Sequence, residues 1–291
     1  GDSDIFVTAT ETMDSGMTIT LKQGWEDIGA GSKASGAGDT ELTIGGLGFG
    51  SISMGQIDTA AAMHDEAASV AVAGGGFSDY SARDAGNFNI RADLATGVDG
   101  LSVSVGVEID NADDSLSHKT AATAGTAVAT AALTDSTNNT DNVMHTSASL
   151  NYNFGAGNVF YGTTDLDEEA GETNEMKNPT IYGANITVGP FFVAYQAISD
   201  GYQSKSTGTG RTGYQDNKTM GVTYNYGPGN VFVESNSSKS TETTDTDGTM
   251  KETIYGLSYK MGSLNTYIQQ EEQNAARGDA GITYVGVEYA F

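Results

Sequence analysis

Acidic side chains are the groups in this chain best placed to do chemistry, because they gather in short runs. The densest run holds Asp165, Asp167, Glu168 and Glu169, and another places two aspartates just before Gly248. Calcium takes about six to eight oxygen ligands, which such runs can supply. Neither run completes the D-x-[DN]-x-[DN]-G-x₅-E calcium loop. Two interpretations stay open: weak calcium sites in acidic loops, or loop charge that is only solvated.

Motifs of nucleotide binding and catalysis are either out of context or absent. Residues 208–213 match G-x-G-x-x-G, but no hydrophobic strand precedes them and no helix is expected to follow. His64, His118 and His145 have no metal-ligand spacing, and the chain contains no nucleophile-elbow sequence. The sequence therefore predicts a protein that is not an enzyme and that uses no cofactor, calcium in the acidic loops being the one ligand left open.

The charge balance favours cations as partners. The 291 residues include 38 acidic and 13 basic side chains, which gives a formal net charge of −25. Such a surface attracts cations and is a poor partner for nucleic acid. The same balance is also compatible with an ordinary solvated acidic surface, as in a protein from salty water. Glycine is abundant at 39 residues and proline is rare at 3, which suits long, unbroken strands.

The elements that must position these residues are strands, and the last stretch of the chain shows this best. In 281–291 the residues Val285, Val287, Tyr289 and Phe291 fall at every second position, with small or charged residues between them. Side chains alternate sides along a strand, so one face is apolar and the other is not. A tilted strand of about 9–11 residues crosses a bilayer, whereas the run of about 18 apolar residues that a transmembrane helix needs is absent.

The same alternation recurs through the chain as seven hairpins followed by a single strand, fifteen strands in all. Each hairpin closes in a short turn that contains Gly or Asp, which favour tight turns. Short turns at one rim and long polar loops at the other are typical of a transmembrane barrel, so the sequence predicts an all-β fold, a transmembrane antiparallel β-barrel. The predicted strands are 4–12, 17–27, 39–46, 49–57, 86–96, 101–110, 142–154, 158–166, 180–188, 191–199, 214–226, 230–238, 250–260, 264–271 and 281–291. The predicted long connections are 27–38, 58–85, 111–141, 167–179, 200–213, 239–249 and 272–280.

The odd number of strands carries a further expectation. Strand 4–12 and the last strand run in the same direction, so they would pair in parallel if they closed a barrel. Bacterial single-chain barrels have an even number of antiparallel strands. We therefore expect a sixteenth strand before Gly1. A fifteen-strand barrel closed by a parallel pair, or one hairpin miscounted, is the alternative.

Several short motifs, spread over the whole length, resemble the general (non-specific) porins of Gram-negative bacteria, in particular the alphaproteobacterial type. They are residues 12–17 leading into 18–25, the strand at 48–55, the long insertion 58–85 and the Val-Glu-Tyr-Ala-Phe ending at 287–291. The resemblance implies one porin β-barrel domain over 1–291, sixteen strands around a water-filled channel, and homotrimers in the outer membrane. It also implies passage of small hydrophilic solutes and contact with membrane lipid and lipopolysaccharide, to which calcium in the acidic loops could bridge.

In that family the connection after the fifth strand folds into the channel and narrows it. When the expected strand before Gly1 is counted as the first, the corresponding segment here is 58–85. The resemblance implies an acidic side of the constriction on this segment and a basic side facing it. With so few basic residues, the channel is expected to prefer cations. An ordinary acidic surface loop is the alternative for 58–85. The acidic side would be Asp58, Asp65, Glu66, Asp79 and Asp84, and the basic side Lys22 and Arg91 together with Arg83 of the segment itself.

Two functions from different classes fit these features. The first is a passive diffusion channel of the outer membrane. The second is an acidic structural or adhesive β-protein of the cell surface without channel activity, since a Gly-, Thr- and Asn-rich acidic chain also suits that role. A solenoid form of the second would show a repeat of fixed period. The loop lengths here vary between hairpins while the short turns do not, which favours the channel.

Overall fold

The structure is a computed structural model that describes residues 5–25, 37–64, 67–71, 88–109, 144–165, 174–204, 213–240, 248–275 and 278–289. The chain divides into two compact units. The first contains the described residues up to 63 and those from 88 to 150, and the second contains the described residues 64–71 and those from 151 onward. Each unit is described by itself.

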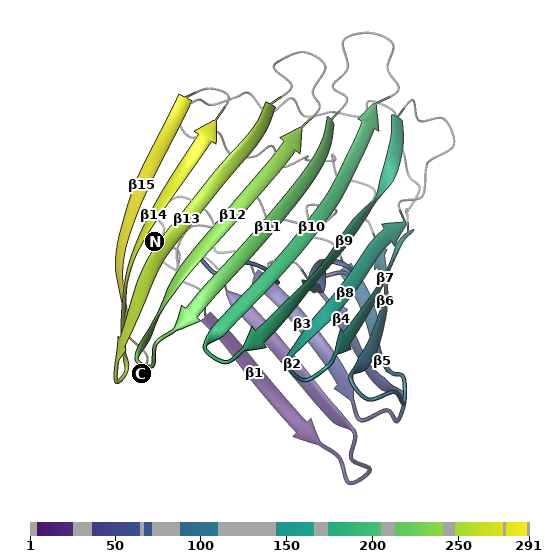
Figure 1. Cartoon of the computed structure of the whole chain (residues 1–291). Helices are drawn as coiled ribbons and strands as arrows, with labels where there is room; N and C mark the ends of the chain where they lie inside the picture. The colour runs from purple at the N-terminus through teal and green to yellow at the C-terminus, as the bar shows by residue number, and fades with distance from the viewer. Residues whose placement is uncertain are drawn as a thin grey trace. The chain divides into compact units, whose positions relative to one another are not determined.

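The fold is all-β, as predicted, and the described residues form fifteen strands that follow one another in chain order in the sheet (Figure 1). Every strand pair whose register is described is antiparallel. The strands that begin in the first unit are β1 (Ile5–Thr12), β2 (Thr18–Trp25), β3 (Ala37–Gly45), β4 (Gly50–Gly55), β5 (Phe88–Ala95), β6 (Leu101–Ile109) and β7 (Met144–Asn153). Those of the second unit are β8 (Gly157–Asp165), β9 (Asn174–Val188), β10 (Phe191–Ser204), β11 (Gly213–Asn225), β12 (Gly229–Ser240), β13 (Gly248–Met261), β14 (Leu264–Ala275) and β15 (Gly278–Tyr289).

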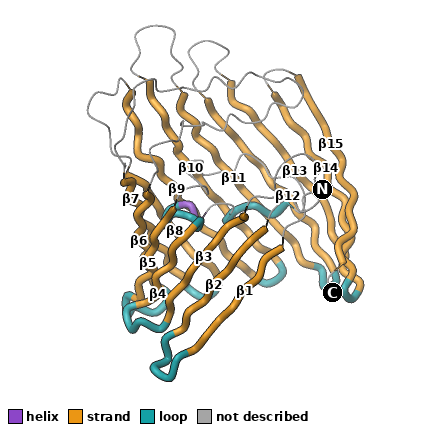
Figure 2. The backbone as a smooth tube through the Cα atoms, turned by 180° about the vertical axis from the view of Figure 1, so that it is seen from behind, coloured by secondary structure: helices purple, strands orange, loops and turns teal. Residues whose placement is uncertain are grey.

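The short turns join the strands into hairpins, and Figure 2 shows them in teal at the strand ends, with the 3-10 helix η1 (Ala62–His64) in purple. The turn between β9 and β10 is only two residues long, and its Gly189 has φ of 57°, a left-handed conformation that costs glycine little. Among the described residues, no helix is long and apolar enough to cross a membrane.

In the first unit the side chains on one face of the sheet are polar and mostly buried, whereas those on the other face are apolar and mostly exposed. On β6 the side chains of Ser104 and Glu108 are buried, whereas Val105 between them is exposed. β7 repeats the pattern, with His145 and Ser147 buried and Leu150 exposed. A water-soluble sheet buries its apolar face instead. This reversal is what a strand needs when its apolar face meets lipid.

The second unit shows the same reversal. On β12 the side chains of Glu234 and Asn236 are buried while Val233 is exposed. On β15 the predicted apolar face carries Val285 and Val287, which are 74 % and 65 % exposed. The last predicted members of this face are Tyr289, whose side chain is outside the described part of the chain, and Phe291, which lies beyond β15.

Three glycines of the second unit are covered by the aromatic ring of the residue directly opposite on the neighbouring strand. Phe160 pairs with Gly183, Phe232 with Gly256, and Tyr267 with Gly286. A Cβ at Gly256 would lie 2.7 Å from Cζ of the opposing ring, so the ring covers the bare backbone. Such aromatic–glycine pairs fix the register of adjacent strands.

The strand boundaries differ from the predicted ones most at the long-loop ends of the second unit. β9 begins at Asn174 rather than at residue 180, and β10 ends at Ser204 rather than at residue 199. The extra residues of β9 include Pro179, which cannot donate a hydrogen bond to the ladder. The structure tolerates Pro179 because the register between β9 and β10 shifts between Ser199 and Gly201, a local bulge. The expected sixteenth strand before Gly1 lies outside the described residues and stays a prediction.

Candidate functional site

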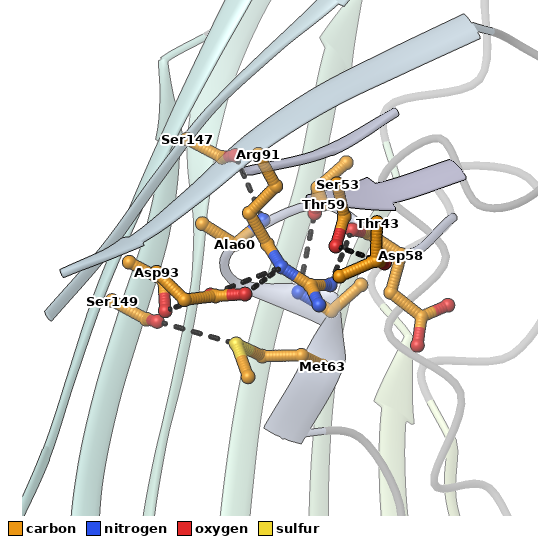
Figure 3. A network of polar contacts seen from close by, with 12 residues as sticks. Thr43, Ser53, Asp58, Thr59, Ala60, Met63, Arg91, Asp93, Ser147 and Ser149 are labelled. Carbon is orange, nitrogen blue, oxygen red and sulfur yellow. Dashed lines mark hydrogen bonds and ion pairs between the residues drawn. The ribbon is translucent and has the colours of Figure 1, made fainter. Parts of the chain in front are cut away.

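The predicted constriction connection 58–85 is described over two stretches that lie against the polar faces of the sheet. We call residues 57–64 and 67–71 the covering segment. In the first unit its backbone is held by side chains of β5 and β7 (Figure 3). Nδ2 of Asn89 donates to the carbonyl oxygen of Ile57 at 2.6 Å, and the backbone N–H of Ala60 donates to Oγ of Ser147 at 3.0 Å. Because strand backbones are engaged in the ladder, these side chains supply the bonds that hold the segment.

Arg91 on β5 joins the start of the covering segment to an acidic neighbour. Its Nη1 donates to the carbonyl oxygen of Asp58 at 3.0 Å, and its Nε lies 3.2 Å and 3.3 Å from the two carboxylate oxygens of Asp93. Oγ of Ser104 donates to the same carboxylate at 2.6 Å. Figure 3 shows the guanidinium between Asp93 and Asp58. Arg91 therefore fixes the backbone of the covering segment at Asp58, and its charge is neutralised by Asp93. The Asp58 side chain itself is exposed.

Small residues let the covering segment approach the first unit closely. Ala60 and Ala61 are fully buried. On the sheet, Gly106 of β6 offers no side chain at the point of contact: a Cβ there would lie 2.9 Å from Oγ of Ser147 and 3.5 Å from the backbone nitrogen of Ala60. The small side chains of Ala60 and Ala61 therefore allow the segment to lie flat against the sheet.

In the second unit the later part of the covering segment is held by one carboxylate. Oε2 of Glu234 on β12 accepts hydrogen bonds from Oγ of Ser69 (3.1 Å) and from the backbone N–H groups of Val70 (2.7 Å) and Ala71 (3.0 Å). The ring of His64 stacks on Phe160 of β8, with ring centroids 4.9 Å apart. These contacts place His64 on the polar face of β8 and residues 69–71 on the polar face of β12.

A row of acids and amides extends from this contact across β12, β13 and β14. Nδ2 of Asn236 lies 2.8 Å from Oε1 of Glu234 and 2.9 Å from Oε2 of Glu252, and donates to both. Nε2 of Gln273 donates in turn to Glu252 at 2.9 Å and to Glu271 at 2.7 Å. All three carboxylates are buried. Alternating amides separate like charges and give each carboxylate a donor.

The other predicted site residues are only partly described. Nζ of Lys22 lies 4.8 Å from the ring centroid of Phe6, a cation–π contact on the polar face of β1 and β2. Glu41 of β3 is its direct cross-strand partner. The remaining predicted constriction residues, Asp65, Glu66, Asp79, Arg83 and Asp84, lie outside the described residues.

The predicted calcium cluster is also described only at its first member. Oδ1 of Asp165 accepts a hydrogen bond from Nδ2 of Asn178 at 2.8 Å. Asp167, Glu168 and Glu169 lie outside the described residues. Across the described stretches, no group of three or more His, Cys, Asp or Glu side chains is arranged to hold a metal ion.

Sequence reasoning missed the residues that hold the covering segment. Asn89, Ser147 and Glu234 occupy polar positions of strands whose alternation was recognised, but nothing in the sequence separates them from other polar-face residues. The signal that was available is the charge of Glu234, a lone acid within the strand sequence Val-Phe-Val-Glu-Ser. Which backbone groups it would meet depends on the path of a segment more than 160 positions away in the chain.

Strands whose apolar faces are exposed and whose polar faces are covered define a transmembrane β-barrel protein. The model of one family, described as Gram-negative porin, matches residues 1–291. The chain therefore belongs to the Gram-negative porins. This family consists of outer-membrane channels and not of enzymes, so the match decides between the two functions that the sequence left open, in favour of the porin.

Solved structures show the same fold at low sequence identity. An anion-selective porin from Comamonas acidovorans is 14 % identical with a TM-score of 0.66, and covers 99 % of this chain and 84 % of its own. A porin structure refined at 1.8 Å resolution is 13 % identical with a TM-score of 0.64, over 99 % of this chain and 92 % of its own. A triple mutant of the Rhodopseudomonas blastica porin is 15 % identical with a TM-score of 0.59, over 100 % and 90 %. No curated protein matches this chain significantly.

Proposed function

We propose that this porin is a general diffusion channel for small hydrophilic solutes, of the alphaproteobacterial type, and that segment 58–85 narrows its bore. The observation that carries the proposal is the covering segment itself, bonded to polar-face side chains in both units. A porin barrel lines its aqueous channel with the polar faces of its strands. A segment bonded to those faces occupies cross-section that would otherwise be open to solutes.

We propose further that the channel prefers cations. The buried carboxylates of the polar faces are Glu108, Glu234, Glu252 and Glu271, and no described Lys or Arg side chain is buried. Arg91 is engaged by Asp93. The formal net charge of −25 acts in the same direction, since a negative field raises the local concentration of cations. The Comamonas acidovorans porin is anion-selective and has the same fold, so selectivity must come from each chain's own charges.

The functional assembly is proposed to be a homotrimer in contact with lipid and lipopolysaccharide. Support comes from the resemblance to general porins and from the exposed apolar faces of strands such as β12 and β15, which need lipid or another apolar surface against them. Calcium held by the acidic loops could bridge to lipopolysaccharide. Addition of a chelator should then lower the heat stability of the native assembly, and an unchanged stability would argue against calcium.

Conductance in planar bilayers with a salt gradient tests the proposal directly. A trimeric cation-selective channel should insert in groups of three equal conductance steps. Its reversal potential should have the sign of the cation's equilibrium potential. A protein that never conducts would refute the channel, and a reversal potential of opposite sign would refute only the selectivity.

The constriction is tested by neutralising Asp65 and Glu66 together. If 58–85 lies in the bore, cation preference should fall. The matched control is Asp99→Asn in the short turn after β5, an exposed carboxylate outside the covering segment. Equal effects of the two changes would place 58–85 away from the constriction.

A further inference from the structure

The second unit holds residues 67–71 of the covering segment between one charged side chain and one bare glycine on adjacent strands. The charged side chain is Glu234 of β12, and the glycine is Gly221 of β11, its direct cross-strand partner. We call this pair the seat. Each member makes a different kind of contact with the segment, so the two can be tested separately.

Glu234 supplies the attractive part of the seat. Its side chain is fully buried, and one of its oxygens accepts three hydrogen bonds from three consecutive residues, Ser69, Val70 and Ala71. Two of the donors are backbone N–H groups, which would be costly to leave without an acceptor. Hydrogen bonds to an ionised acceptor are shorter and stronger than neutral ones. The other carboxylate oxygen is fixed by Asn236.

Gly221 supplies the close approach. A Cβ at this position would overlap the carbonyl oxygen of Ala68 and would lie 2.8 Å and 3.2 Å from the two methyl carbons of Val70. Any residue other than glycine would therefore force the segment away from β11. Ala68 is fully buried, so the segment fills this contact completely.

The seat is backed by the row of acids and amides on β12, β13 and β14, which we call the wall. Glu234 is the first member of the row, which continues through Asn236, Glu252 and Gln273 to Glu271 on β14. Each member is hydrogen-bonded to the next, so the row supports the Glu234 carboxylate at the position where residues 69–71 bind it.

We propose that Glu234 is a positioning residue and Gly221 a spacing residue, which together hold residues 67–71 against the wall and so set the largest solute that the channel admits. The proposal rests on the proposed function, because it needs 58–85 to lie in the bore. It predicts opposite effects of two changes at one seat. Without the carboxylate the segment is no longer held, so a large solute can displace it and pass. A methyl group at Gly221 instead pushes the segment permanently toward the bore and narrows it.

The first test uses Glu234→Ala, with Glu234→Gln as the matched variant and Glu272→Gln as the control. Glutamine retains an acceptor oxygen for the segment but has no charge, and Glu272 is exposed on the opposite face of β14, outside the row that holds Glu234. In liposome swelling with uncharged sugars of increasing size, Glu234→Ala should admit larger sugars than the native protein does. Glu234→Gln should retain most of the native cut-off, and Glu272→Gln should keep it. If Glu234→Gln behaves like the alanine variant, charge and not position sets the cut-off, and the proposal is wrong.

The second test uses Gly221→Ala, which should slow the largest permeant sugars and lower the single-channel conductance. A Gly221→Ala channel indistinguishable from the native one would overturn the proposal even if the alanine variant at Glu234 fails to assemble. Assembly of every variant is checked by its heat-dependent electrophoretic mobility.

Amide hydrogen exchange separates failure of the seat from failure of the channel. In reconstituted protein, Glu234→Ala should raise exchange of the peptide covering Val70 and Ala71 at least about tenfold, equivalent to about 1.4 kcal/mol, while Glu234→Gln stays close to native. Unchanged exchange shows that Glu234 does not hold the segment and overturns the inference. Faster exchange with unchanged sugar cut-off shows that the segment is held but lies outside the bore, which overturns the inference and the constriction role of 58–85 while leaving the channel intact.

Discussion

The contact between Arg91 and Asp93 makes a sharp prediction, because the guanidinium has two different tasks. It pairs with the Asp93 carboxylate, and it donates to the backbone carbonyl of Asp58 at the start of the covering segment. Replacing Arg91 by Met removes both interactions and retains most of the side-chain volume. Replacing Asp93 by Asn removes only the ion pair. A double-mutant cycle of these changes therefore isolates the pair from the bond to Asp58.

The expected coupling energy follows from the burial of the two side chains. Arg91 is 15 % exposed and Asp93 is 29 % exposed. Exposed pairs contribute up to about 1 kcal/mol, whereas breaking a fully buried pair costs about 3–5 kcal/mol. An intermediate pair, with solvent still at the carboxylate, should show a coupling of about 1–2 kcal/mol. Arg91→Met alone also loses the bond to the Asp58 carbonyl, so its total cost should be about 2–3 kcal/mol of unfolding free energy.

The assay is urea-dependent unfolding in lipid vesicles, followed through the fluorescence of the single tryptophan of the chain. Arg91→Lys is the control: it keeps the charge, but an ammonium cannot reproduce the planar fork that reaches two acceptors, so its stability should be intermediate. A coupling below about 0.3 kcal/mol, the usual error of additivity, would show that the pair is screened by solvent and that the burial argument is wrong.

Three further changes test the fold. Val233 is 47 % exposed on the apolar face of β12. Replacing it by Arg should lower the unfolding free energy of the protein in vesicles by about 2–4 kcal/mol, and replacing it by Leu should leave it almost unchanged. Equal effects of the two changes would show that this face does not contact lipid. Gly286→Ala puts a methyl group into the ring of Tyr267 and should cost about 1–3 kcal/mol in the same assay, with partial recovery when the ring is replaced by Leu. Ser147→Ala leaves a buried N–H without its acceptor and should cost about 1–3 kcal/mol. Thr146→Ala, on the opposite face of the same strand, should stay within about 0.5 kcal/mol, and a Ser147 effect no larger than this would remove Ser147 from the set that holds the segment.

The fold could be predicted from the sequence because the residues of a membrane strand alternate between apolar ones, which face lipid, and polar ones, which face the interior. In β6, five apolar residues alternate with Ser102, Ser104, Gly106 and Glu108, and no tertiary contact is needed to see it. Period-2 alternation over many strands with short glycine turns leaves few other architectures. The boundary errors are largest at the long-loop ends, as in β9, which continues through Pro179 to Asn174 because the ladder accommodates the proline at a bulge.

The sequence pointed to segment 58–85 as the candidate site, but it gave no information on the contacts of that segment. The resemblance assigned the constriction to 58–85, and four of the described alanines in this segment, Ala60, Ala61, Ala62 and Ala68, are buried. The predicted opposition of charges across a gap differs from what Arg91 does, since its guanidinium bonds to the backbone of Asp58 and to Asp93 on its own strand. Alternation assigns a side chain to a face. It does not say whether that side chain meets water or a segment of chain.

Backbone hydrogen bonding explains why polar side chains hold the covering segment. Strand N–H and C=O groups are used up in the ladder, so a segment laid across strands can find acceptors and donors only in side chains. This requires polar residues such as Asn89, Ser147 and Glu234 at the contact points, and small ones such as Gly106 and Gly221 between them. The same faces would have to be polar to line an aqueous channel. One alternating pattern thus satisfies both requirements, and substitutions that keep a polar face hydrophilic but alter its hydrogen-bonding groups should change the bore while leaving the barrel folded.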